Sequence, residues 1–556
     1  MKQNISLREK ILELLMLDIR YFGRDSKDNY IPQQTLDIKV KIFLKEYPVG
    51  GITLFRENID SDKQVKILTK EIQQNTNIPR FIAIDEEGGV VSRIGIETIG
   101  NMALGALNDI SETKKTASLI AYKLSSLGIN FNFAPVVDIN SNPDNPIIGV
   151  RAFGSNPKLV TSHANAFIHG LHEFNIISTI KHFPGHGDTS TDSHIGTTTV
   201  DKSLDELLCT DLLPYTTLIK ENILDVIMTA HIVVPELDAN VICYNNKNSP
   251  IPATLSTEIL TNLLRKKMQF DGIVITDAMD MKAITNNFDV VFASIESFRA
   301  GSDIILMPVR IWDDNGIKKF KEYFSKICEI CNFDQELQKR INESYKRVVD
   351  LKTKFFLKNK NDINNFPIND FIKYQDSLAG KSFTLYKNAQ NHLPFNLCDP
   401  INLLVIGNKE NLLNDATHEI KHIFKQNLTK NKLNSIESIC LNYAKINKEI
   451  ISSKLKNISQ IIILTYDLSQ QDKEINTLFT ILNKSAVPYV MISCRSPYDI
   501  KYATKAKTNI LIYGVTGFDQ TNYKINKFLL NLRSVLSKLF IYDFIDNFNV
   551  FCPIIV

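Results

Sequence analysis

The sequence predicts an α/β protein, in which a (β/α)8 barrel of the TIM type is followed by a smaller α/β sandwich domain. Through the first 310 residues, short runs rich in Ile, Val and Phe alternate with helix-length stretches, which is typical of βα units around a parallel sheet. Residues suited to chemistry follow the ends of these runs, as they do at the active-site face of a barrel. With 556 residues the chain is too long for one ordinary core, so we expect two domains.

Eight strand-like runs can be placed in this first part of the chain. They cover residues 14–19, 50–55, 81–85, 130–138, 176–183, 226–231, 272–277 and 303–308, and the first is the least distinct because it continues a helix-like stretch. The runs that end at or beside a reactive side chain do so at Asp85, Asp138, His182, His231 and Asp277. One polar residue at a strand end is ordinary, but five in register predict the mouth of a barrel.

The second domain is expected after an exposed connection rich in Asn, Lys and Pro. We therefore predict a catalytic barrel over residues 1–350, a linker over 351–377 and a C-terminal α/β domain over 378–556. Further apolar runs predict a smaller parallel sheet in that domain, at 401–407, 460–468, 487–493 and 509–515.

The composition is that of a soluble globular protein, with 44% apolar residues, 22% charged residues and a net charge of +3. No nucleic-acid partner is expected, because the basic residues are scattered rather than clustered. No membrane association is expected either, since no run of 18 apolar residues occurs. The first 23 residues carry charges inside their apolar stretch, unlike a secretory signal, and the eight cysteines are spread out, so we expect a reduced, cytoplasmic protein.

The densest group of reactive residues is KHFPGHGDTSTDSH, residues 181–194. Such a loop could bind a metal or perform acid/base catalysis. Its prolines and glycines exclude a helical pair of metal-binding histidines, whereas Asp192 lies two residues from His194, where it could orient the imidazole and hold its proton. We therefore expect no metal and no cofactor. The CxxC of Cys328 and Cys331 lies in a helix-like stretch without a second pair, so it predicts no metal site.

Two further groups accompany this loop. Asp277 ends an apolar run in GIVITDAMDM and would face the barrel mouth, although a solvated loop aspartate would look the same. IDEEGGVVSR contains Asp85, Glu86, Glu87 and Arg93 around two glycines, which let the backbone turn tightly beneath a ligand. Carboxylates and Arg are usual partners of sugar hydroxyls.

Taken together, these motifs resemble the NagZ-type β-N-acetylglucosaminidases of glycoside hydrolase family 3, here in a two-domain form. KHFPGHGDTxxDSH is the hallmark loop of that subgroup. It is accompanied in the same order by GGITLFRENI, DEEGG, NFAPVVDI, GVRAFGSNP, MTAHI, PATLS, ITDAMDM and AGSDIIL. The resemblance covers roughly residues 10 to 310 and implies a β-N-acetylhexosaminidase that removes terminal N-acetylglucosamine from a glycan.

The resemblance also implies a role for each matching residue. Asp277 would be the nucleophile, His194 the general acid/base, and Asp192 the partner of His194; retaining enzymes of this kind form a covalent glycosyl intermediate. The positions that match sugar-binding residues are Asp85, Arg93, Arg151, Lys181 and His182. The sequence departs from the family pattern at Glu86, where Gln is frequent, and at Val150, where an acidic residue is frequent.

Several alternatives remain at this point. A neutral imidazole repels phosphate less than a carboxylate does, so phosphorolysis is a variant of the same chemistry. A family 3 β-glucosidase would take its acid from the C-terminal domain, and a substrate-assisted hexosaminidase would use an adjacent pair such as Asp85 and Glu86. A non-enzymatic alternative is a glycan-binding protein that has the barrel but no catalytic activity. The oligomeric state and the natural glycan are not encoded in a readable pattern.

Overall fold

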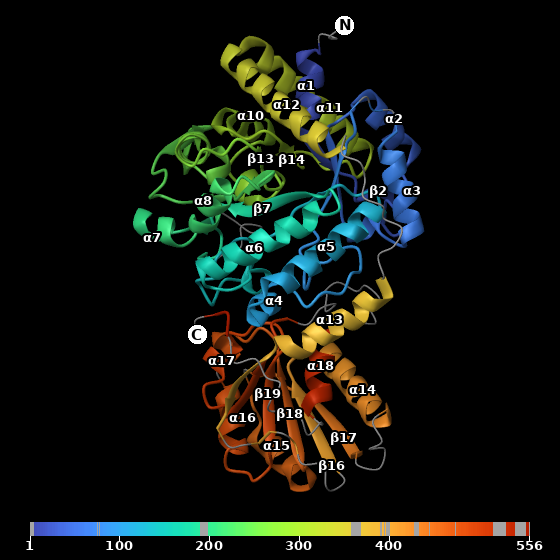
Figure 1. Cartoon of the computed structure of the whole chain (residues 1–556), viewed down its shortest axis with the longest axis vertical. Coiled ribbons are helices and arrows are strands. Elements are labelled where there is room, and N and C mark those ends of the chain that lie inside the picture. Colours follow the sequence, from blue (N-terminus) through green and yellow to red (C-terminus); the bar gives the residue numbers. More distant parts are fainter. Residues whose placement is uncertain are drawn as a thin grey trace.

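The structure, a computed structural model, describes residues 5–74, 76, 78–189, 198–356, 368–389, 392–393, 395, 401–426, 433–443, 445–472, 474–514, 530–539 and 552–554. These residues form two large sheets, each with its own helices. In Figure 1 the barrel occupies the upper part of the molecule and the second α/β domain the lower part.

Eight parallel strands form the barrel, and each coincides with one of the predicted runs. They are β1 (Leu15–Asp18), β4 (Gly51–Leu54), β5 (Phe81–Ile84), β6 (Phe131–Asn132), β7 (Ile177–Phe183), β9 (Val226–Thr229), β13 (Ile273–Ile275) and β14 (Ile305–Leu306). The strand order is β13-β9-β7-β6-β5-β4-β1-β14, and a parallel bridge between Ile275 and Ile304 closes the ring. The predicted barrel is therefore confirmed.

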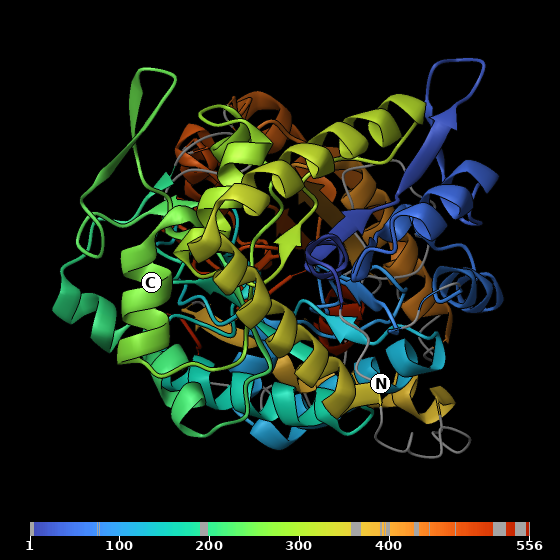
Figure 2. The same ribbon diagram turned by 90° about the horizontal axis from the view of Figure 1, so that it is seen from above.

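Helices surround the strands, as the view from above shows (Figure 2). The first half of the barrel has α1 (Leu7–Glu13), α2 (Ile38–Glu46), α3 (Asp62–Ile72), α4 (Asn101–Leu107), α5 (Ile110–Ser126) and α6 (Pro157–His172). The second half has α7 (Leu204–Cys209), α8 (Leu213–Lys220), a π-helix (Glu258–Lys267), α9 (Lys282–Thr285), α10 (Val290–Ala300), α11 (Asp314–Phe333) and α12 (Gln335–Phe356). Short hairpins β2–β3 (Tyr21–Arg24 and Tyr30–Pro32) and β11–β12 (Val241–Tyr244 and Lys247–Pro250) project from the rim, and β8 (Thr198–Thr199) pairs with β10 (Ile232–Val233).

Local chemistry sets where these helices begin. The side chain of Asn156 accepts hydrogen bonds from the backbone N–H groups of Lys158 and Leu159, and Pro157 occupies the first turn of α6, where no N–H partner is needed. At α1, Ser6 and Glu9 form a reciprocal capping box. Strands β1, β4, β5, β7 and β9 are buried along their whole length, as expected for parallel strands covered by helices.

The second domain is built on a six-stranded sheet in the order β15-β20-β19-β18-β16-β17. Four strands match predicted runs, namely β16 (Ile401–Gly407), β18 (Gln460–Thr465), β19 (Tyr489–Ser493) and β20 (Thr508–Leu511). The other two, β15 (Thr384–Asn388) and β17 (Leu433–Cys440), were not predicted as strands, and β15 is antiparallel to β20. The helices are α13 (Ile368–Ser382), α14 (Glu410–Gln426), α15 (Lys448–Lys454), α16 (Ile475–Leu482), α17 (Asp499–Tyr502) and α18 (Leu530–Leu539).

Between the domains, α12 continues to Phe356 and α13 begins at Ile368. The domain boundaries themselves, at 1–350, 351–377 and 378–556, stay a proposal. Within the described ranges, no helix combines the length and apolar character needed to cross a membrane.

Candidate active site

The side chains named by the sequence gather at the ends of the barrel strands. Asp85 follows β5 directly, Lys181 and His182 lie near the end of β7, and Asp277 comes two residues after β13. Arg151 ends a short 3-10 helix (Gly149–Arg151) in the connection after β6. Because the carboxyl ends of the parallel strands meet at one face, residues far apart in the chain become neighbours there.

A network of ion pairs joins three of these residues to Glu87. The Nζ of Lys181 lies 2.7 Å from Oδ1 of Asp85 and 2.6 Å from Oε1 of Glu87. The guanidinium of Arg151 donates from Nε and Nη2 to the two oxygens of Glu87, at 2.9 and 2.8 Å. Glu87 is buried between the two cations, whereas the side chain of Asp85 keeps 24% of its surface exposed. Of the two carboxylates in this ion-pair network, Asp85 is therefore the one that a ligand can reach.

Opposite charges keep the side chains of this ion-pair network ionised. Burial opposes ionisation of Glu87, but Arg151 and Lys181 outweigh it and hold the pKa of this carboxyl well below its usual range. Burial likewise opposes the ammonium of Lys181, yet Asp85 and Glu87 raise its pKa overall. A fixed array of charges and donors therefore exists at the barrel mouth before any ligand binds.

A second group centres on Asp138, which ends the segment after β6. Its Oδ2 accepts from Nδ1 of His182 at 2.7 Å, and its Oδ1 accepts from the backbone N–H groups of His182 and His186 at 3.2 and 2.7 Å. Asp138 is buried, and although burial opposes ionisation, the neighbouring His182 lowers its pKa overall. The bond to Nδ1 fixes the ring of His182 and leaves Nε2 as its remaining polar atom.

His186 is held in its neutral form. Burial and the neighbouring His182 lower the pKa of His186 to about 4, against the opposing influence of Asp138 and Asp277. Its Nδ1 lies 2.7 Å from Oγ1 of Thr189. Asp277 itself is half-buried, and its Oδ1 accepts from the backbone N–H of Ala278 at 2.7 Å.

Glu86 is bound to the backbone of the turn that follows it. The Glu86 side chain is fully buried, and its Oε2 accepts from the backbone N–H groups of Arg93 and Ile94 at 2.7 and 3.1 Å. Glu86 therefore fixes the backbone of the 86–94 turn. The Nε of Arg93 is buried and has no hydrogen-bond partner among the described residues.

The predicted dyad, Asp192 and His194, lies outside the described residues. The chain is described up to Thr189 and again from Thr198, in β8. The other predicted site residues are all described: Asp85, Arg151 and Lys181 belong to one cluster, His182 to the neighbouring group, and Arg93 to the turn after Asp85. No set of three metal-ligating side chains comes together within the described ranges.

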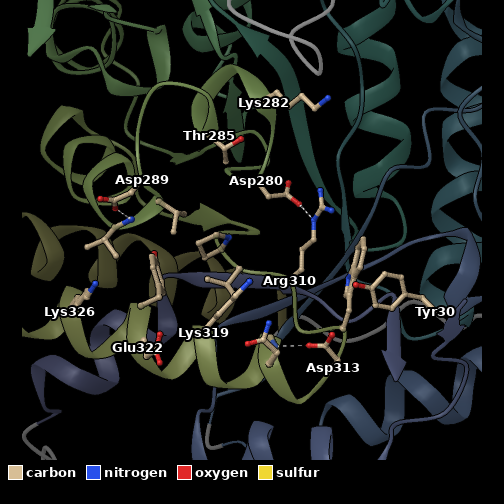
Figure 3. A pocket seen from close by; sticks show the side chains of 18 residues that line it. Tyr30, Asp280, Lys282, Thr285, Asp289, Arg310, Asp313, Lys319, Glu322 and Lys326 are labelled. Carbon is tan, nitrogen blue, oxygen red and sulfur yellow. Dashed lines mark hydrogen bonds and ion pairs between the residues drawn. The ribbon is translucent and has the colours of Figure 1, made fainter. Parts of the chain in front are cut away.

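A groove of about 830 Å³ opens at the same face of the barrel (Figure 3). Asp280, three residues after Asp277, pairs with Arg310 in its wall. Trp312 also lines the groove and donates from Nε1 to Asp18 at 3.1 Å, while the ring of Tyr30 packs edge-on against it. The groove shares no lining residue with the Asp85–Lys181 cluster.

Two contributors were not predicted as site residues. Glu87, which links Lys181 to Arg151, lies in the DEEGG turn, where an acidic residue looks like an ordinary loop residue. Asp138 was noted only as a strand-end residue. A signal existed in both cases, because a carboxylate next to a run of buried residues needs a cationic or N–H partner.

Comparison with known proteins identifies the family. Residues 6–351 match the model described as the Glycosyl hydrolase family 3 N terminal domain. Beta-hexosaminidase A of Pseudoalteromonas piscicida is 42% identical over 358 residues, which are 61% of this chain and 60% of that protein. A Beta-hexosaminidase of Haemophilus influenzae (strain ATCC 51907 / DSM 11121 / KW20 / Rd) is 34% identical over 266 residues, 47% of this chain and 72% of that protein. The chain thus spans about 60% of the length of the first of these curated relatives.

Solved structures extend the similarity to the second domain. A glycoside hydrolase family 3 β-N-acetylglucosaminidase from Paenibacillus sp. str. FPU-7 superimposes with a TM-score of 0.76 at 26% identity, covering 96% of this chain and 97% of that one. A beta-glucoside phosphorylase superimposes with a TM-score of 0.77 at 21% identity, covering 99% and 94%, and shares the fold. The family resemblance read from the motifs is confirmed: the chain belongs to glycoside hydrolase family 3.

Proposed function

We propose that this protein is a retaining β-N-acetylhexosaminidase that removes terminal, non-reducing N-acetylglucosamine from a glycan. The observation that carries the proposal is the ion-paired array of Asp85, Lys181, Glu87 and Arg151 at the barrel mouth, on the same face as Asp277. The family, and relatives named beta-hexosaminidase, support the same reaction class.

Asp277 would act as the nucleophile. Its carboxylate attacks the anomeric carbon while the bond from that carbon to the leaving oxygen breaks, which gives a covalent glycosyl ester. The hydrogen bond from the N–H of Ala278 to Oδ1 supports this role, because it helps to orient the carboxylate. Water then attacks the same carbon and releases the sugar with retained configuration.

His194 would donate the proton to the leaving oxygen in the first step and take a proton from water in the second. An imidazole suits both tasks because its ordinary pKa, about 6.5, lies near neutral pH. Asp192, two residues earlier, would orient the ring and favour the charged imidazolium.

The sugar would be held by Asp85, Lys181, Arg151, His182 and Arg93. The exposed part of Asp85 supports contact with a hydroxyl. The buried Nε of Arg93, which has no hydrogen-bond partner in the part of the chain that the structure describes, supports a hydrogen bond to a sugar oxygen. Because Lys181 and Arg151 are already ion-paired, they are ordered before the substrate arrives, which lowers the entropic cost of binding.

Two of the alternatives find less support. Glu86 is fully buried and bound to backbone N–H groups, so it cannot share a substrate acetamido group with Asp85, as a substrate-assisted mechanism would need. A β-glucosidase would not need the Asp192-Ser193-His194 segment. Phosphorolysis differs only in the acceptor, and the experiment below includes it.

We also propose a cytoplasmic setting, in which peptidoglycan fragments or chitin oligosaccharides are the glycans. Support comes from the seven described cysteines, none of which forms a disulfide although Cys209, Cys243 and Cys440 are exposed.

The decisive experiment measures nitrophenol release from 4-nitrophenyl N-acetyl-β-glucosaminide and from the matching β-glucoside. We expect turnover of the N-acetyl substrate alone, loss of that activity in Asp277→Ala, and trapping of a glycosyl-Asp277 ester with a 2-fluoro sugar by mass spectrometry. Added phosphate should not yield a sugar 1-phosphate. Strong turnover of the glucoside, or full activity in Asp277→Ala or His194→Ala, would refute the assignment, and a sugar 1-phosphate would replace hydrolysis by phosphorolysis.

A further inference from the structure

The second domain holds a barrel loop that borders the candidate site. This loop, residues 140–145, follows Asp138 in the connection after β6. The hydroxyl of Tyr498 accepts a hydrogen bond from Nδ2 of Asn140 at 2.8 Å and donates to the carbonyl oxygen of Asn140 at 3.3 Å. Both residues are almost fully buried, at 3% and 1% exposure. The contact is therefore a dry, specific junction between the two domains.

A second junction lies at the other end of the same loop. Asp144 pairs with Nζ of Lys501 at 2.7 Å and accepts from the hydroxyl of Tyr502 at 2.8 Å. Tyr498, Lys501 and Tyr502 all come from helix α17 or the residue before it. Helix α17 of the second domain, with the preceding Tyr498, thus binds both ends of the 140–145 loop.

The 140–145 loop in turn holds residues 186–189, the last described residues before Asp192 and His194. Asn145 donates from Nδ2 to the carbonyl oxygen of His186 at 2.8 Å and to Oγ1 of Thr189 at 3.2 Å. Asn142 donates to the carbonyl oxygens of Asp188 and Thr189, at 3.3 Å each. Side-chain amides of the 140–145 loop therefore donate hydrogen bonds to backbone carbonyl oxygens of residues 186–189.

The backbones also approach closely. A Cβ at Gly187 would lie 1.8 Å from the carbonyl oxygen of Ile139, so this position cannot accept any larger residue without separating the two segments. Ser141 adds a hydrogen bond to Oδ1 of Asp188 at 2.8 Å. A displacement of the 140–145 loop must consequently move residues 186–189, because the packed contact has no room to absorb it.

We propose that Tyr498, Lys501 and Tyr502 are positioning residues for the proton-transfer steps: the second domain fixes the 140–145 loop, which fixes the segment that leads into the proposed acid/base dyad. This inference rests on the proposed function, and chain connectivity links the described contacts to Asp192, three residues after Thr189. The ion pairs of Lys181 with Asp85 and Glu87 involve no residue of the 140–145 loop. We therefore expect the second domain to act more strongly on proton transfer than on sugar binding.

The test compares substrates that need the acid to different degrees. A 2,4-dinitrophenyl leaving group departs without a proton, whereas the sugar leaving group of N,N′-diacetylchitobiose needs one. In the full-length protein, Tyr498→Phe and the double variant Lys501→Met/Tyr502→Phe should lower kcat/KM for chitobiose roughly tenfold or more, while the dinitrophenyl substrate changes less than about twofold. KM should stay constant, and Asp144→Asn should reproduce the effect of the double variant without adding to it.

Two references make the outcome decisive. Lys454→Met removes an exposed ion pair with Glu437 elsewhere in the second domain and should leave both substrates unaffected. His194→Ala should show the same selective loss as the domain variants, only larger. Equal losses for both substrates, or none, in the domain variants would overturn the inference while a selective loss in His194→Ala leaves the proposed function intact. No selective loss in His194→Ala would overturn the proposed acid/base residue and the inference with it. Thermal denaturation of Tyr498→Phe, which keeps the buried ring, shows whether the variant is folded.

Discussion

Arg151 and Glu87 are joined by two parallel hydrogen bonds, from Nε and Nη2 of the guanidinium to the two carboxylate oxygens, at 2.9 and 2.8 Å. This ion pair links the segment after β6 to the turn after β5. It therefore fixes two neighbouring segments at the barrel mouth. Glu87 also binds Lys181, which gives one buried carboxylate two cationic partners.

Replacing Arg151 by Lys should therefore impair catalysis although the charge is kept. A single ammonium cannot make both hydrogen bonds, and we expect kcat/KM to fall roughly 10- to 100-fold, the equivalent of about 1–3 kcal/mol. Steady-state kinetics with the nitrophenyl substrate measure this effect. Arg299→Lys, at a half-exposed pair with Glu296 and Asp334, is the matched control and should behave as wild type. Unchanged kinetics in Arg151→Lys would remove Arg151 from the site.

Glu86 should make the stability depend on pH near neutrality. Burial raises the pKa of Glu86 to about 7 from an ordinary 4.5, so between these values the folded protein binds more protons than the unfolded one. The free energy of unfolding contributed by this group is thus fully present below pH 4.5 and is lost as pH rises through 7.

The substitution Glu86→Gln removes this dependence and should raise stability at pH 8 by roughly 1–3 kcal/mol, since a neutral amide can accept the same two backbone hydrogen bonds. Denaturant titrations at pH 5 and pH 8 test the difference, with the exposed Glu322→Gln as control. If Glu86→Gln lowers stability equally at both pH values, the carboxyl is already ionised at pH 5 in the folded protein and the expectation is wrong.

Much of the fold was predictable because its signals are local. All eight barrel strands coincide with apolar runs, since parallel strands covered on both faces consist almost entirely of apolar residues. Strand β17 (Leu433–Cys440) escaped because its residues are mostly exposed or half-exposed at the sheet edge. Strand β15 is short and half-exposed as well.

The site was predictable to a smaller extent. Asp85 and Lys181 could be named from motifs at strand ends and Arg151 from the GVRAFGSNP motif, and the structure brings the three together. Their link through Glu87 depends on which way one loop carboxylate points, and the junction of Tyr498 with Asn140 joins residues 358 positions apart. Contacts of that kind follow from the packing of whole domains, which no local pattern records.

Asp138 should control which nitrogen of His182 carries its proton. A carboxylate accepts from Nδ1, whereas an amide in Asp138→Asn must either donate to Nδ1 or turn its N–H groups toward the backbone donors of His182 and His186. We expect kcat/KM to fall about 100-fold or less, with the ring of His182 protonated on Nε2 instead of Nδ1. Kinetics and nitrogen-15 NMR of the imidazole measure the two effects, and an unchanged tautomer with full activity would contradict them.

The pKa of Asp138 is lowered in the folded state, so the contribution of Asp138 to the free energy of unfolding is present above its unfolded pKa and is lost as pH falls.

Asp303 should be the costliest carboxylate to lose, because it closes the barrel. It is fully buried and accepts hydrogen bonds from Arg265, Arg340 and Arg347. One of its oxygens also accepts from the backbone N–H of Val274, in β13, at 2.9 Å. Burial opposes ionisation, but the three guanidinium groups outweigh it and hold the pKa of Asp303 far below its usual range. The stability that Asp303 supplies is present above its unfolded pKa and disappears as pH falls toward the folded value.

In Asp303→Asn, three partly buried arginines lose the charge that they surround, and we expect the free energy of unfolding to fall by about 3–5 kcal/mol. Asp334→Asn is the matched control: Asp334 pairs with Arg299 on the surface and accepts from the N–H of Leu337, which an Asn can also do. That variant should lose less than about 1 kcal/mol. Chemical denaturation followed by circular dichroism compares the two. Equal losses of stability in the two variants would mean that the three arginines find other partners. A larger loss in Asp303→Asn, together with an unchanged KM, would show that Asp303 serves barrel closure and not substrate binding.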